Sequence, residues 1–265
     1  MLIASIGLLG AVAAGVVGTH VTWRTAYLIG GLMGLGLLGL RIGLAESEMF
    51  RNLDGVEVPR GSILLLLKSP RRVMRYVRCI GAGLVTYLVV GFVVTGAPEF
   101  GKAMQLRETP SAGIAVLICY LAMAVGDLVC TLMSQVTQSR KLPLIVFNCF
   151  VLSGFAILAF HPPTTLFGFY ALCAELGFGC GFWSLVATFA AEQFGTNLRA
   201  TVTTTVPNFI RAALIPISAA FAFLRPHLGI LNAALWLGAM TVALAIVAIA
   251  FSPETFGKNI EFLEA

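Results

Sequence analysis

Residues 142–160 read LPLIVFNCFVLSGFAILAF, and no charged side chain interrupts the run. An α-helix rises 1.5 Å per residue, so a helix of this length crosses the roughly 30 Å hydrocarbon core of a bilayer. The rest of the 265-residue chain is similar, because 58% of its residues are apolar, only 11% are charged and the mean hydropathy is +0.94. Soluble domains carry about 25% charged residues. The composition therefore excludes a soluble globular protein.

Further apolar runs of similar length fill the chain, and charge clusters or Pro and Gly residues separate them. Only α-helices and closed β-barrels satisfy all backbone hydrogen bonds in lipid, and the sequence lacks the alternation that is typical of barrel strands. We therefore predict an all-α polytopic membrane protein with about eight transmembrane helices, near 2–21, 25–44, 79–97, 113–135, 142–160, 166–190, 200–224 and 231–251.

The basic residues are distributed unevenly over this arrangement. One long polar stretch, 45–78, separates the second and third predicted spans and holds many of them. If this stretch faces the cytoplasm, twelve of the 17 Lys and Arg lie in cytoplasmic segments, four lie in outer segments, and Arg211 lies inside a span. The positive-inside rule then predicts a multi-pass protein of the inner (plasma) membrane with both termini in the cytoplasm.

The polar stretch itself contains a helix signal. Ser69-Pro70 is a typical helix start, and in such a helix Arg71, Arg75 and Arg78 share one face. One interpretation is a solvated basic linker. The other is an interfacial helix held by anionic lipid, at about 1 kcal/mol per basic residue near the surface.

Five short patterns follow one another along the chain: WRTAYLIGG at 23–31, AES at 45–47, MSQVTQSRK at 133–141, EQFGTNLRAT at 192–201 and SPETFGK at 252–258. Together, and in this order, they resemble the major facilitator superfamily (MFS), in particular its sugar porters and metabolite symporters. Two positions depart from the family pattern, since Gln135 stands where the family usually has Asp and Gln138 where it often has Gly.

The resemblance aligns the chain with helices 5 to 12 of a twelve-helix transporter. It implies the last two helices of an incomplete N-terminal bundle at 1–44, a cytoplasmic central loop at 45–78, a complete C-terminal six-helix bundle at 79–251 and a cytoplasmic tail at 252–265. Helices 1 to 4 have no counterpart in this alignment. One hypothesis is therefore an N-terminally truncated, transport-incompetent fragment with at most a structural role, in which transport requires the missing four N-terminal helices.

Arg211 is the first candidate for contact with a substrate. A charge inside a span is energetically costly, so its presence there indicates a functional role. It belongs to a polar stripe with Asn208 on one helix face. Its guanidinium can hold an anionic group through two parallel hydrogen bonds. Trp183 and Tyr87 are candidates for lining the same cavity, and the alternative for each is packing inside the bundle. The alternative for Arg211 is a structural ion pair with Asp127 or Glu175.

Asp127 and Glu175 are the acidic residues expected inside spans. A buried carboxyl group can exchange a proton as a cavity opens and closes, so each is a candidate for proton coupling. The alternative for Asp127 is a cap or an ion pair, and the alternative for Glu175 is a structural partner.

The resemblance also implies a gate at the cytoplasmic end of the bundle. In the family, a Glu and an Arg after helix 10 join ion pairs with the neighbouring loops, and Glu192 and Arg199 occupy these positions here. Arg140 and Glu254 are their expected partners. The alternative is a pair of solvated loop charges that contribute little.

Taken together, these features predict secondary active transport of a small solute by alternating access, with proton coupling as in a symporter. The solute is an organic anion, a sugar or another metabolite. The sequence holds no phosphate-binding Gly-Lys-Ser/Thr loop, no catalytic motif and no metal-ligand cluster. We therefore expect neither an enzyme nor a cofactor or metal site, and the expected partners are the lipid bilayer and the small-molecule substrate, without nucleic acid.

Overall fold

The computed structural model describes residues 7, 10, 13, 17, 21–42, 63–258 and 262–264. All regular elements in these ranges are helices. They are α2 (Trp23–Arg41), α4 (Ile63–Leu67), α5 (Pro70–Gly81), α6 (Leu84–Leu88), the π-helix η1 (Val89–Val94), α7 (Ala97–Ala103), α8 (Ala112–Val136), α9 (Lys141–Phe160), α10 (Leu166–Gly179), α11 (Trp183–Glu192), α12 (Thr196–Ala212) and α13 (Leu214–Ala250).

Five helices of the described part are long and apolar enough to cross a membrane, and six are when the bent pair of Pro70–Gly81 and Leu84–Val94 is included. One of them, Thr196–Ala250, has 55 residues and would measure about 80 Å if it were straight, which is more than twice the hydrocarbon thickness. Gly229 interrupts it with a φ of 75°, so it makes two crossings. The prediction of an all-α polytopic fold is confirmed. The span expected at 2–21 lies largely outside the described residues.

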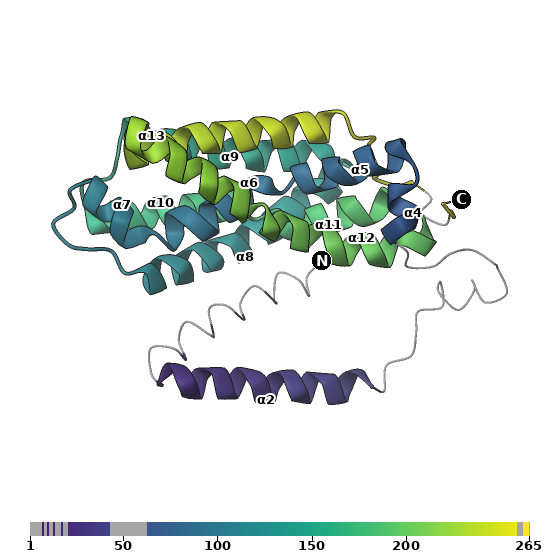
Figure 1. Cartoon of the computed structure of the whole chain (residues 1–265), viewed down its shortest axis with the longest axis horizontal. Coiled ribbons are helices and arrows are strands. Elements are labelled where there is room, and N and C mark those ends of the chain that lie inside the picture. Colours follow the sequence, from purple (N-terminus) through teal and green to yellow (C-terminus); the bar gives the residue numbers. More distant parts are fainter. Residues whose placement is uncertain are drawn as a thin grey trace.

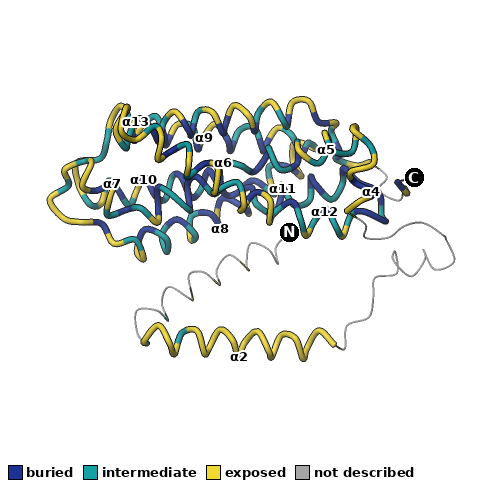
Figure 2. The backbone as a smooth tube through the Cα atoms, in the orientation of Figure 1, coloured by how far each residue is buried: buried dark blue, intermediate teal, exposed yellow. Residues whose placement is uncertain are grey.

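The helices of 63–258 lie along one long axis (Figure 1). One end of the bundle carries α7 and the turn inside α13, and the opposite end carries α4, the start of α5 and the C-terminus. The second half of α13, residues 230–250, runs beside α9, while α8 packs against α10. Buried residues fill the space between the helices, whereas α2 is exposed along nearly its whole length (Figure 2).

Two of the predicted spans are broken in the middle. The span expected at 166–190 consists of α10 and α11, which are separated at 180–182, and the span expected at 200–224 breaks at Ala213. Pro216 explains the second break, because a proline has no N–H to donate to the carbonyl of Ala212 four residues earlier. The backbone at Ala213 keeps a helical φ of −60° and ψ of −17°, and Arg211 lies in the last turn of α12 before this lost hydrogen bond.

Helices α8 and α10 approach each other closely at two glycines. A Cβ atom on Gly177 of α10 would collide with the backbone carbonyl of Cys119 in α8, and one on Gly126 of α8 would collide with the carbonyl of Phe178 in α10. Small residues allow such backbone contact between membrane helices. This contact fixes α10, and through the chain also α11, against α8.

Candidate functional site

Four residues from three helices meet in a polar cluster on one face of the bundle. The Nε of Arg211 in α12 donates to the hydroxyl of Tyr87 in α6 at 2.7 Å, and its Nη1 donates to Oδ1 of Asn208 at 3.0 Å. The ring of Tyr87 packs edge to face on Trp183, the first residue of α11, with 5.8 Å between the ring centroids. These are the four residues predicted for the substrate. We call Arg211, Asn208, Tyr87 and Trp183 the arginine cluster.

The two faces of α12 explain why these polar groups are accessible. Val202, Val206 and Ile210 point into the core and are fully buried, while Asn208 and Arg211 lie on the exposed face. A guanidinium has five N–H donors. In the described part of the chain Arg211 uses two of them, so three are available to an external acceptor.

The alternative of an ion pair between Arg211 and Asp127 or Glu175 does not describe this structure. Both hydrogen bonds of Arg211 go to neutral groups, the hydroxyl of Tyr87 and the amide of Asn208. A guanidinium bonded only to neutral partners keeps its full positive charge for an anion.

Asp127 is fully buried in α8 and caps the start of α11. Its Oδ1 accepts the backbone N–H of Ser184 at 2.9 Å, and its Oδ2 accepts the Ser184 hydroxyl at 2.5 Å. A carboxylate at a helix N-terminus is favourable because the unpaired N–H groups there carry partial positive charge. Since Ser184 follows Trp183, Asp127 fixes the end of α11 that supplies the aromatic wall of the arginine cluster.

Glu175 lies in a different part of the bundle. Its Oε1 accepts the hydroxyl of Ser153 at 3.0 Å. The residue lines a groove of about 490 Å³ between α8, α9 and α10, and apolar side chains such as Val125, Phe150 and Phe178 form the rest of the lining. The structure therefore does not bring Glu175 together with the arginine cluster.

Three of the four residues predicted for the gate do meet, at the end of the bundle that carries the C-terminus. Arg140 binds Glu192 through two parallel hydrogen bonds, Nε to Oε2 at 3.1 Å and Nη2 to Oε1 at 2.8 Å. Glu254 accepts the backbone N–H of Arg140 at 2.9 Å and the hydroxyl of Ser139 at 2.6 Å. The Thr255 hydroxyl donates to Glu192 at 2.7 Å and so joins the two halves.

The fourth predicted gate residue, Arg199, lies at the same end of the bundle, where its Nε donates to the carbonyl of Ala191 at 3.3 Å. Gln138, which replaces the family's glycine in the loop between α8 and α9, has a φ of 50°. Glycine adopts this left-handed region most readily, so the backbone keeps the shape that the family pattern indicates.

The same end contains a second network that the sequence does not indicate. Glu264 of the C-terminal tail is 9% exposed and binds both Arg72 and Arg75 of α5, at 3.0 and 2.8 Å. Asn197 fixes the tail further, because its amide donates to the Glu264 carbonyl and accepts the Glu264 N–H, each at 3.0 Å. The tail thereby connects α5 with the start of α12.

These contacts change the view of the basic helix expected inside 45–78. Helix α5 runs across the predicted boundary at residue 78 and bends by 42° into the next part of the span. Arg75 donates to the carbonyl of Gln193 as well as to Glu264, so it faces the protein and not a lipid surface. Arg75 therefore binds protein groups, and the contact of this helix with anionic lipid stays a prediction. Arg71 is exposed.

Acid is expected to weaken the Glu254 contacts. Burial raises the pKa of this carboxyl, but hydrogen bonds from the Ser139 hydroxyl and from the backbone N–H groups of Arg140, Phe256 and Thr255 outweigh it and lower the pKa from 4.5 to about 2. The stability that the ionised Glu254 carboxylate gives to the folded protein is fully present above pH 4.5 and is lost as the pH falls toward 2. The difference in melting temperature between wild type and Glu254→Gln in detergent should therefore narrow below pH 4.5. A constant difference down to pH 2.5 would contradict the prediction.

The fold and the cluster define a multi-pass helical membrane protein with a cationic site on one face of its bundle. The sequence model of the Major Facilitator Superfamily matches residues 1–215. The chain therefore belongs to this family, whose members transport small solutes across membranes. A search of curated proteins gives no significant match.

Proposed function

We propose that the chain acts in secondary active transport of a small organic anion, and that the arginine cluster contacts the anion. The observation that carries this proposal is the bonding of Arg211, which holds two neutral partners and keeps three N–H donors for an external group. A carboxylate accepts two parallel N–H bonds from one guanidinium. The edge-to-face pair of Tyr87 and Trp183 beside it offers an apolar surface for the body of the substrate.

Asp127 is the better of the two candidates for proton coupling. It holds the start of α11 through Ser184, next to Trp183, so a change in its protonation acts directly on the wall of the arginine cluster. Glu175 accepts a hydrogen bond from Ser153 and lines an apolar groove between α8, α9 and α10, away from the arginine cluster. In this proposal the end of the bundle with the Arg140 and Glu254 network faces the cytoplasm of a plasma membrane, and both termini lie on that side.

Binding and uptake test the proposal separately. Purified full-length protein should be titrated calorimetrically with a panel of small monocarboxylates and dicarboxylates and their neutral amides. Uptake of the ligand that binds best should then be measured in proteoliposomes that contain the protein. Loss of charge-assisted hydrogen bonds costs about 1.5–3 kcal/mol, so Arg211→Gln is expected to weaken binding of the anion at least about tenfold.

Arg225→Gln is the matched control for this experiment. Arg225 lies near the turn inside α13. Within the described residues its guanidinium forms one long contact, at 3.4 Å with Glu99, and both side chains are more than half exposed. This variant should bind as the wild type does. If Arg211→Gln binds every carboxylate of the panel with unchanged affinity, the arginine cluster is not the anion site.

A further inference from the structure

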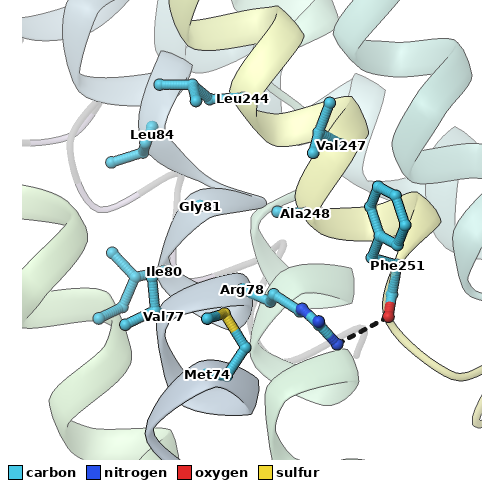
Figure 3. Close-up of a pocket in the computed structure, with 10 residues that line it drawn as sticks. All are labelled: Met74, Val77, Arg78, Ile80, Gly81, Leu84, Leu244, Val247, Ala248 and Phe251. Carbon is cyan, nitrogen blue, oxygen red and sulfur yellow. Dashed lines mark hydrogen bonds between the residues drawn. The ribbon is translucent and has the colours of Figure 1, made fainter.

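A groove of about 420 Å³ lies where α5 and α6 face the second half of α13 (Figure 3). Its floor is narrow because Gly81 and Ala248 touch, and a Cβ atom on Gly81 would lie only 2.9 Å from the Cβ of Ala248. Apolar side chains form its walls: Met74, Val77 and Leu84 on one side, and Leu244, Val247 and Phe251 on the other.

The side chains that form these walls are largely exposed. Met74 and Val77 are each 53% exposed, Val247 is 52% exposed and Phe251 is 70% exposed. In a chain that crosses a membrane, an exposed apolar groove between two span ends faces acyl chains. Apolarity alone does not distinguish one lipid from another, so any selectivity depends on the polar group at the mouth of the groove.

Arg78 is that group. Figure 3 shows its guanidinium lying across the end of the groove toward Phe251, where Nη1 donates to the Phe251 carbonyl at 2.8 Å. In the described part of the chain this is the bond that Arg78 makes, and no carboxylate there pairs with it. Four of its five N–H donors are therefore available. Its charge is also held in place, because the last carbonyls of α13 attract cations.

Arg71 adds a second positive charge on the same side. It precedes Arg78 by seven residues, or two helical turns, so the two side chains share one face of α5 about 10 Å apart, with Met74 between them. Arg71 is exposed, whereas Arg72 and Arg75, on the adjoining side of the helix, bind Glu264. The face of α5 that borders the groove thus carries two cations at its polar end and apolar side chains beyond them.

We propose that this groove binds an anionic phospholipid, with its phosphate on Arg78 and Arg71 and one acyl chain along the floor between Val77 and Val247. The charge pattern is complementary to this amphiphile, since cations lie at the membrane surface and the groove extends from them along the span. The site is separate from the arginine cluster and does not depend on the proposed transport function. Of the three arginines that the sequence places on one face of this helix, Arg71 and Arg78 bind the lipid phosphate in this proposal, whereas Arg75 binds Glu264.

Native mass spectrometry of the full-length protein in detergent tests the proposal. The protein is titrated with phosphatidylglycerol and with phosphatidylcholine of the same acyl chains. Each basic residue near an anionic surface contributes about a fivefold gain in affinity, so the wild type should prefer phosphatidylglycerol by at least about fivefold. Arg78→Gln should lower this preference about fivefold, because Arg71 remains. Val247→Trp, which fills the groove, should weaken the binding of both lipids.

Lys141→Gln is the matched control, because Lys141 caps the same end of α13 from the side of α9, with its Nζ 2.8 Å from the carbonyl of Ala250. It loses the same charge and the same kind of bond but leaves the groove unchanged, so its lipid preference should equal that of the wild type. An equal loss in Lys141→Gln, or an unchanged preference in Arg78→Gln, overturns the proposal. If Arg78→Gln does not fold, Arg71→Gln takes its place, because this side chain is exposed, and a preference unchanged in that variant likewise overturns the proposal.

Discussion

Replacing Arg140 with methionine is expected to lower the free energy of unfolding by about 3–5 kcal/mol, because the change leaves the Glu192 carboxylate buried without its counter-charge. The side chains of the pair are only 10% and 15% exposed, and the guanidinium bonds both carboxylate oxygens of Glu192. The same guanidinium donates to the Ser134 hydroxyl and lies over the ring of Phe256. Unfolding in mixed micelles of a mild detergent and dodecyl sulfate measures the loss.

Two further variants show whether burial is the cause. Arg225→Met removes the exposed ion pair with Glu99, and such pairs are worth about 0–1 kcal/mol, so this variant should be close to wild type. The double variant Arg140→Met/Glu192→Leu removes both charges and should recover much of the stability lost in the single variant. A loss below about 1 kcal/mol in Arg140→Met would mean that solvent screens the pair.

The spans themselves could be predicted closely where the sequence contains sharp boundaries. The predicted ranges 113–135 and 142–160 correspond to Ala112–Val136 and Lys141–Phe160. The polar run from Gln135 to Lys141 lies between them, and a short polar loop has no other place than the membrane surface. Composition and loop charge were therefore sufficient for the fold class and for these boundaries.

The internal breaks were harder to predict. Nothing local in the run from Gly179 to Trp183 distinguishes a flexible glycine segment from a true break in the helix. The new helix begins at Trp183 because Asp127, more than 50 residues earlier, accepts the N–H of Ser184. A cap supplied by a distant segment leaves no signal in the sequence around it.

The candidate site could be predicted only in part, because some of its contacts also join distant segments. The spacing of Asn208 and Arg211 places them on one helix face, and a charge in a span indicates a functional face. Tyr87 was named only as an aromatic residue in a span, and its bond to Arg211 joins residues 124 positions apart. Glu264 was missed, because nothing in the tail sequence distinguishes this glutamate from its neighbours or shows that Arg72, Arg75 and Asn197 surround it.

Replacing Gly177 with valine is expected to lower the free energy of unfolding by about 3 kcal/mol. Overpacking a tight contact costs about 1–3 kcal/mol, and here the added Cβ meets the backbone carbonyl of Cys119, which cannot change rotamer as a side chain can. Gly113→Val at the start of α8 is the control, because a Cβ there has only the Ser111 hydroxyl within reach, at 3.8 Å. Melting in detergent compares the two, and equal melting temperatures would show that α8 and α10 do not pack this closely.

The milder variant Gly177→Ala connects this packing contact with the proposed anion site. Helix α10 continues into α11 after a short break, so moving α10 away from α8 also moves Ser184 away from Asp127 and Trp183 away from Tyr87. We therefore expect Gly177→Ala to weaken anion binding at the arginine cluster even though no atom of Gly177 contacts the cluster. Calorimetric titration of folded protein measures this effect, with Gly113→Ala as the control. Unchanged affinity in Gly177→Ala would mean that the break between α10 and α11 absorbs the displacement.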